Sequence, residues 1–263
     1  MSNKSRKSNG VVLWRGVSAF DGMTPIMVIA TGIRGKSRNG KTGAMVQCWI
    51  LPEVENPFSA ITHGGDACIC GTCEHRGIIV DGRNVKRTCY VDVPKAPLNI
   101  WRTFHRGRYP TVTPDQAAEL FRGRKVRLGA YGDPAAVPYA IWEAILRYVA
   151  AHTGYTHAWE SCDPRFARIC MASVDTVRQY MRAKARGYRT FRPKFEHEAR
   201  EPREMVCGAS KEMGHRTSCD LCVACGGTSS KARVDIVIDV HGISPIVKAY
   251  ALTRQRIEAR ENA

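Results

Sequence analysis

The residues of this chain that are best suited to chemistry are its cysteines, most of which fall into two groups. The first group comprises Cys68, Cys70, Cys73 and Cys89. The second group comprises Cys207, Cys219, Cys222 and Cys225. A Cys-x-x-Cys turn lets two sulfur atoms face one ion, and four thiolates bind zinc or an iron–sulfur cluster. The spacing therefore predicts a bound metal at each group, either zinc or an iron–sulfur cluster.

The two groups differ in how completely they define a metal site. In the second group the four cysteines lie close together beside turn-forming glycines, and all four are predicted ligands. In the first group Cys70, Cys73 and Cys89 are the predicted ligands, and either Cys68 or His75 is the fourth. The chemical alternatives are disulfides and buried thiols that bind nothing.

The sequence context favours reduced thiols. Residues 1–10 are polar and basic and do not resemble a signal peptide, and no stretch is long and apolar enough to span a membrane. We therefore expect a cytoplasmic protein without a membrane partner, in a compartment where clustered cysteines hold metals more often than they form disulfides. Cys48, Cys162 and Cys170 lie in apolar or strand-like segments, and we expect them to be buried thiols.

The charge of the chain points to a polyanionic partner. Its 40 Lys and Arg residues exceed its 24 Asp and Glu residues, which gives a formal net charge of +16. Such an excess favours nucleic acid as the partner. The basic residues are dispersed, which suits contact with the phosphate backbone better than readout of bases. The alternative is a basic composition that serves no such partner.

The segments that would position these residues alternate between strands and helices along much of the chain. Strands are expected at residues 11–13, 25–30, 44–51, 125–130, 154–157, 166–172, 188–192, 205–207 and 234–240. Helices are expected around residues 141–149 and from an N-cap at Ser173 to Gly187. This pattern predicts an α/β fold with a full or partial (β/α) barrel, and a doubly wound open sheet is the alternative.

One domain would then cover residues 11–263, preceded by a disordered basic arm over residues 1–10. Cys-rich insertions are expected at about residues 60–97 and 207–230. The loop at 35–43 matches a phosphate-binding loop in its letters. A strand rather than a helix is expected to follow it, which argues against nucleotide hydrolysis.

Several polar side chains directly follow the predicted strands, which is where a (β/α) barrel has its active site. The candidate catalytic residues are Asp133, Asp175 and His157. Two carboxylates near each other can divide the roles of nucleophile and of acid or base between them. The structural alternative is that both carboxylates favour helix starts. The candidate substrate-binding residues are Tyr131, Tyr155, Ser173, Arg192 and His241.

A set of motifs across nearly the whole chain resembles a bacteriophage-encoded family of unknown function. The motifs are Cys70-Gly-Thr-Cys73-Glu-His-Arg76, Cys89-Tyr-Val91, residues 129–138, Gly154-Tyr-Thr-His157, Cys170-Met-Ala-Ser173 and the second cysteine group. A further resemblance, to the phage DpdA-type enzymes, involves the predicted barrel, the strand-end aspartates, the late Cys-rich site and the basic surface. Those enzymes are similar to tRNA-guanine transglycosylases, which implies zinc and exchange of guanine for a 7-deazaguanine base.

These features together predict a metalloenzyme of the infected host cell that acts on nucleic acid. The most concrete form is a DNA-guanine transglycosylase that takes a small deazaguanine-like base. One alternative is an iron–sulfur redox or radical-type enzyme in which Cys70, Cys73 and Cys89 hold a cluster with an open iron. The other is a non-enzymatic zinc-dependent protein that binds nucleic acid. Iron with acid-labile sulfide would favour the redox enzyme, whereas zinc alone would favour the other two.

Overall fold

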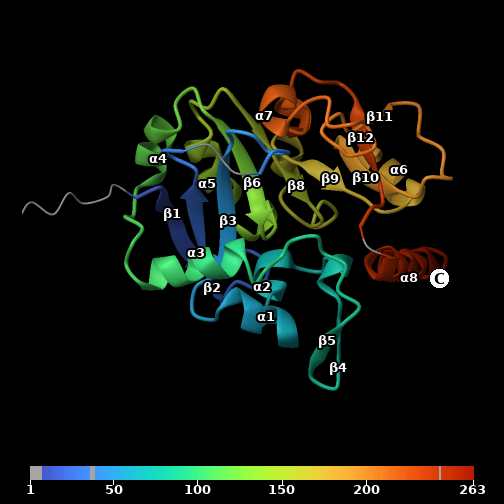
Figure 1. The fold of residues 1–263 in the computed structure, drawn as a ribbon, viewed down its shortest axis with the longest axis horizontal. Helices are drawn as coiled ribbons and strands as arrows, with labels where there is room; N and C mark the ends of the chain where they lie inside the picture. Colours follow the sequence, from blue (N-terminus) through green and yellow to red (C-terminus); the bar gives the residue numbers. More distant parts are fainter. Residues whose placement is uncertain (1–7, 36–38, 243) are drawn as a thin grey trace, which may run out of the picture.

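The computed structural model describes residues 8–35, 39–242 and 244–263, which form a mixed α/β fold (Figure 1). The first five-stranded sheet contains, in spatial order, β1 (Gly10–Val17), β2 (Pro25–Thr31), β3 (Val46–Pro52), β6 (Lys125–Tyr131) and β7 (Ala151–Thr153). Its first three strands are antiparallel, and β3, β6 and β7 are parallel to one another. The sheet therefore changes from antiparallel to parallel pairing at β3.

The second five-stranded sheet is parallel throughout. In spatial order it contains β8 (Tyr155–Thr156), β9 (Met171–Ser173), β10 (Thr190–Lys194), β12 (Asp235–Asp239) and β11 (Glu204–Val206). Only Gly154 separates β7 from β8, so a single stretch of chain pairs with the first sheet and then with the second. A Cβ at this position would lie 2.8 Å from the carbonyl oxygen of Ile169, which explains why glycine is needed there.

The helices and a small hairpin surround these sheets (Figure 1). The α-helices are α1 (Pro57–His63), α2 (Ala67–Cys70), α3 (Ala96–His105), α4 (Pro114–Leu120), α5 (Tyr139–Ile145), α6 (Val177–Ala185), α7 (Cys219–Cys222) and α8 (Ser244–Glu261). The hairpin consists of β4 (Ile78–Val80) and β5 (Arg83–Val85). Short 3-10 turns occur at Glu74–Arg76, Pro134–Ala136, Pro164–Arg168 and Gly227–Ser229. None of the described helices combines the length and the apolar character that crossing a bilayer requires.

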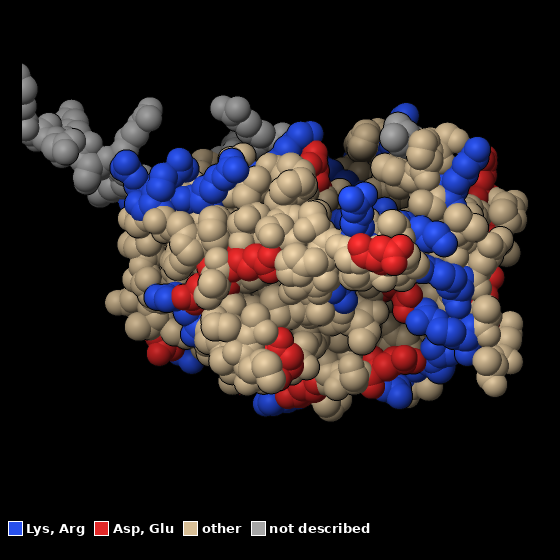
Figure 2. Space-filling model, turned by 90° about the horizontal axis from the view of Figure 1, so that it is seen from below, with Lys and Arg blue, Asp and Glu red and all other residues tan. Residues whose placement is uncertain are grey.

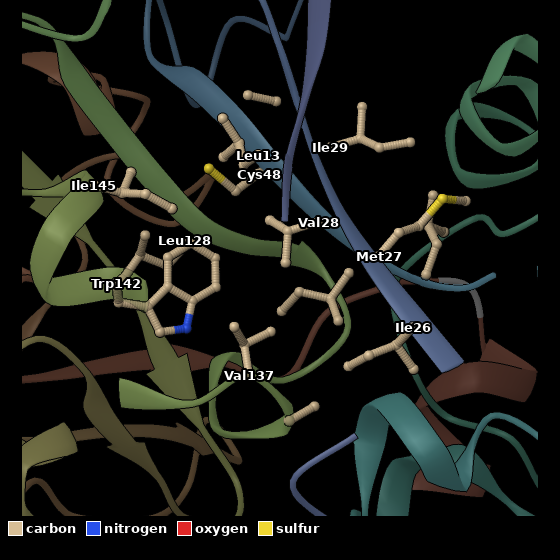
Figure 3. Close-up of a cluster of buried hydrophobic side chains, with 14 of the residues drawn as sticks. Leu13, Ile26, Met27, Val28, Ile29, Cys48, Leu128, Val137, Trp142 and Ile145 are labelled. Atoms are coloured by element: carbon tan, nitrogen blue, oxygen red, sulfur yellow. The ribbon is translucent and has the colours of Figure 1, made fainter. Parts of the chain in front are cut away.

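The main apolar core lies on the first sheet (Figure 3). Strand β2 is buried along almost its whole length, and Trp142 of α5 packs beside Leu128 of β6. The indole N–H of Trp142 donates to the carbonyl of Pro134 at 2.9 Å, so this large side chain is buried without an unpaired donor. Cys48 and Cys170 belong to this core, as expected, whereas Cys162 is only partly buried.

The structure confirms a mixed fold with parallel strands, but the expected full barrel is wrong for the described residues. The first sheet has β1 and β7 at its edges and the second has β11 and β8, and no described strand pairing closes either sheet into a barrel. In the second sheet the strands follow chain order from β8 to β10, and β12 then lies between β10 and β11. The chain thus builds two open sheets that are joined through Gly154.

Some local expectations also need correction. The strand expected at 166–172 is found only at its end, where Met171 begins β9. Its first residues belong to the turn Pro164–Arg168, which starts where the Asp163 side chain accepts the N–H of Arg165. The N-cap of α6 is Thr176 and not Ser173, since the Thr176 hydroxyl accepts the N–H of Gln179 at 2.9 Å. The basic arm expected at 1–10 falls mostly outside the described residues, and Gly10 already belongs to β1.

Arg192 was expected to bind substrate, but it is a structural residue of the second sheet. Its guanidinium makes two hydrogen bonds to the carboxylate of Glu204, at 2.7 and 2.6 Å, and both side chains are fully buried. A buried charge that has lost its partner is costly, because the remaining group has neither water nor a counter-ion. This pair therefore holds β10 and β11 in place across β12.

We expect Glu204→Ala to lower the free energy of unfolding by about 3–5 kcal/mol, because it strands a buried guanidinium. Chemical denaturation followed by circular dichroism measures this change. Glu119→Ala is the matched control, since it breaks the exposed pair with Arg122 and should cost about 0–1 kcal/mol. Equal costs for the two variants would contradict the structural role of Arg192.

Candidate functional site

A cavity of about 370 Å³ lies against the parallel strands and brings the two cysteine groups together. Side chains from β6, β7, β8, β9, β10 and β12 form one part of its wall. The loops that carry the cysteines form the rest. Cavities of this size are typical of sites for small molecules and cofactors. We therefore take this cavity as the candidate functional site.

All four cysteines of the second group line the cavity. Cys207 directly follows β11, and its N–H donates to the carbonyl of Val237 at 2.8 Å. Cys219 and Cys222 bound the short helix α7, and Cys225 is buried behind them. Burial raises the pKa of the Cys225 thiol to about 12, and the charges of the other three thiols add to that rise. The four sulfur atoms are therefore electrostatic neighbours.

The first group reaches the cavity through Cys89, while Cys70 and Cys73 lie behind it. Burial raises the pKa of Cys70 well above its usual value, and Cys73 and Cys89 contribute to that rise. Burial also opposes ionisation of Cys73, but the adjacent His157 outweighs it and lowers the pKa of this thiol. The Cys73 thiolate, with Asp175 and Asp133, in turn outweighs the effect of burial on His157 and raises its pKa to about 10.

Two buried polar atoms beside the first group have no hydrogen-bond partner within the described chain. They are Nη2 of Arg87 and the hydroxyl of Tyr131. Cys89 contributes most to favouring the charge of Arg87, and Cys70 adds to burial in raising the pKa of Tyr131. Tyr131, expected to bind substrate, thus lies against these thiols and does not line the cavity. Both atoms can donate a hydrogen bond, and both lack an acceptor at this position near the cysteines.

His75 is held at the cavity wall by a buried network. Its Nε2 lies 3.0 Å from Oδ1 of Asp175, and its Nδ1 lies 2.8 Å from the hydroxyl of Thr88. The hydroxyl of Tyr250, from α8, donates to the same Asp175 oxygen at 2.9 Å, and its ring stacks on His75. Burial opposes the charge of Asp175, but His75 outweighs it and keeps the pKa of the carboxyl well below its usual range.

The carboxylate of Asp133 is hydrogen-bonded to backbone N–H groups through both of its oxygens. One carboxylate oxygen accepts the N–H of Ala135 at 2.9 Å, and the other accepts the N–H of His157 at 2.7 Å. The side chain is buried and does not line the cavity, and burial raises its pKa. It therefore starts the turn after β6 and fixes the backbone that carries His157.

Sequence reasoning thus identified part of the cavity wall. His157, Tyr155, Ser173 and His241 line it as expected, whereas Asp133, Asp175, Tyr131 and Arg192 do not. Sequence reasoning missed Tyr250 as the partner of Asp175, because α8 was not among the expected helices. Arg127, which the sequence offers only as one of several basic residues that could contact phosphate, lines the cavity from β6.

The described residues contain no group of three or more His, Cys, Asp or Glu side chains that is arranged to hold a metal ion. The thiols of each group are close enough to influence one another's ionisation, but they are not gathered around one ion. The predicted metal sites therefore stay predictions that depend on the chemistry of the donor sets.

We expect Tyr250→Phe to lower the free energy of unfolding by about 1–3 kcal/mol, because the buried Asp175 loses a hydrogen-bond donor. Urea denaturation measures this. Tyr139→Phe is the matched control, since the Tyr139 hydroxyl has no hydrogen bond to the chain as described. If Tyr250→Phe were as stable as Tyr139→Phe, the contact between α8 and Asp175 would not stabilise the fold.

Comparison of the chain with models of known families, with curated proteins and with solved structures found no match. Its function must therefore be inferred from its own residues and their geometry.

Proposed function

We propose that this protein is a metal–sulfur enzyme, with thiolate-bound metal at both cysteine groups and a substrate cavity between them. The observation that carries this proposal is that Cys89 of the first group and all four cysteines of the second, although far apart in the sequence, border one cavity. A purely structural metal site would not need to face a cavity. Metal held at a cavity wall is placed where it can act on a bound substrate.

Both donor sets are compatible in ligand type with iron–sulfur clusters, and the four thiols of the second set are equally compatible with zinc. The first group offers three thiols, Cys70, Cys73 and Cys89, which would leave one position of a cluster open to substrate. The unpartnered Arg87 and Tyr131 donors lie beside these thiols. Hydrogen bonds from such donors to cluster sulfurs are one way in which proteins set the reduction potential. The second group offers the four thiols that a complete cluster requires.

A bound iron–sulfur cluster would supply one-electron chemistry to this cavity. The surrounding residues would bind and orient the substrate. Tyr155, Phe191 and Ile236 provide apolar walls that exclude water, and His75 is fixed by Asp175 and Tyr250 so that its imidazole has one orientation. The near-sequential parallel strands around the cavity support the further proposal that the two sheets form an open, partial barrel.

A second candidate is zinc-dependent action on DNA, most concretely guanine exchange. The charge of +16 favours it, and Figure 2 shows Lys and Arg gathered on the side of the molecule where α6 and α8 lie. The carboxylates weigh against it, since Asp133 is bonded to the backbone through both oxygens and Asp175 lies behind His75. A zinc-dependent binding protein without catalytic activity would need only the charge and the second cysteine group.

Metal analysis of the anaerobically purified protein separates these proposals. We expect iron and acid-labile sulfide, and we expect Cys222→Ser to lose the metal of the second group and several kcal/mol of stability, because metal-binding energy is folding energy. Cys162→Ser is the control, since Cys162 lies outside the cavity. Zinc without sulfide would replace the redox proposal by the second candidate. An unchanged metal content in Cys222→Ser would contradict the proposed metal site at the second cysteine group.

Binding to DNA is expected to weaken steeply with salt, because each neutralised phosphate releases counter-ions. The slope of log affinity against log salt should be about −0.9 for each phosphate contacted. Fluorescence anisotropy with a labelled duplex and a labelled single strand at several salt concentrations measures it. If the protein bound neither DNA nor RNA at low salt, the proposed nucleic-acid partner would be wrong.

A further inference from the structure

Two cations in the cavity wall have no carboxylate partner in the described ranges. Arg127 projects from β6 into the cavity wall, and its Nε is buried without a hydrogen-bond partner. Lys41 lines the same cavity from the glycine-rich loop, and it forms no ion pair with any described residue. The one carboxylate in the wall, Asp239, is already paired with Lys194 at 2.7 Å. The cavity therefore has a positive end that lacks an anion.

The chain around Lys41 and Ala44 is fixed against the second cysteine group. The N–H of Cys219 donates to the carbonyl of Lys41 at 2.7 Å, and the N–H of Ala44 donates to the carboxylate of Asp220 at 2.9 Å. These bonds place Lys41 at the cavity although it is far from α7 in the sequence. Lys41, which belongs to the stretch that matches a phosphate-binding pattern in its letters, is thus part of the cavity wall.

The rest of the cavity offers flat, apolar surfaces. Tyr155 and Phe191 meet edge to face, with ring centroids 5.0 Å apart. Tyr90 and His241 stack on each other at 5.2 Å in another part of the wall. Aromatic side chains of this kind bind the faces of nucleobases. A ligand that matches both ends would have a planar body and an anionic group.

We propose that the cavity binds one nucleotide, with its phosphate at Arg127 and Lys41 and its base against the aromatic wall. This deepens the proposed function, since it names the substrate class for the same cavity. A volume of about 370 Å³ suits one nucleotide rather than a longer strand segment. The nucleotide is either free or a single unit of a strand that enters the cavity.

The competing explanation is that the two cations only balance the charge of the cysteines, since Arg127 and Lys41 both influence Cys219. Calorimetric titration of the full chain, purified anaerobically, separates the two. The probes are 2′-deoxyguanosine 5′-monophosphate, 2′-deoxyguanosine, inorganic phosphate and a single-stranded pentanucleotide with a central guanine. Metal content is measured on every sample, so that loss of metal and loss of ligand binding are read separately.

We expect the nucleotide to bind at least about tenfold more tightly than the nucleoside or phosphate alone, because charge-assisted hydrogen bonds fix its phosphate. Lys41→Gln and Arg127→Gln should each weaken nucleotide binding about tenfold and leave nucleoside binding unchanged. Arg147→Gln is the matched control, because it removes an equal charge outside the cavity. Tighter binding of the pentanucleotide than of the monophosphate would identify a strand as the source of the nucleotide.

Three results would overturn the proposal. One is equal affinity for nucleotide and nucleoside, or no binding of either. Another is an equal loss of affinity in Arg147→Gln. The third is loss of metal in Lys41→Gln and Arg127→Gln without loss of nucleotide affinity, which would assign both cations to the cysteines. Absence of metal from the native chain would instead refute the metal–sulfur enzyme and leave the nucleotide site standing.

Discussion

The site of this protein depends on one stretch of chain that passes from one sheet into the other. Strand β7 pairs with β6, strand β8 pairs with β9, and Gly154 lies between them without room for a side chain. The N–H of Gly154 donates to the carbonyl of Cys225 at 3.0 Å, which ties the second cysteine group to this junction. Without this direct connection from β7 to β8, the two sheets would not share a cavity, and the two cysteine groups would not border the same space.

The cavity is bordered by buried polar groups that are satisfied with few exceptions. Asp133 holds the turn after β6, and Asp175 holds His75 and Tyr250. Each buried carboxylate thus has donors that offset the cost of removing it from water. Several buried polar atoms of the described chain have no hydrogen-bond partner, and three of these residues lie beside cysteines: Arg87 and Tyr131 at the first group and Arg127 at the second. An anionic ligand or a thiolate-bound cluster would supply hydrogen-bond acceptors for these three donors.

The C-terminal helix α8 supports the cavity wall indirectly, through Asp175 and the residues that follow it. Besides the bond from Tyr250 to Asp175, the Glu261 carboxylate accepts the hydroxyl of Thr176 at 2.8 Å and pairs with Arg182. These contacts join α8 to the start of α6, where Asp175 is located. The orientation of His75 therefore depends on a helix that follows it by more than half of the chain.

The sequence by itself determined the grouping of the cysteines along the chain, the positions of most strands, and the strand-end placement of His157, Ser173 and His241. These features are local, because they follow from the spacing of a few residues and from strand periodicity. Only the tertiary structure decided that Asp133 serves the backbone, that Arg192 is paired with Glu204 in the interior, and that His75 meets Asp175. Each of these outcomes is a contact between residues separated along the chain, for which no sequence periodicity exists. The open edges at β1 and β11 were undecided for the same reason, since closure of a sheet is set by long-range pairing.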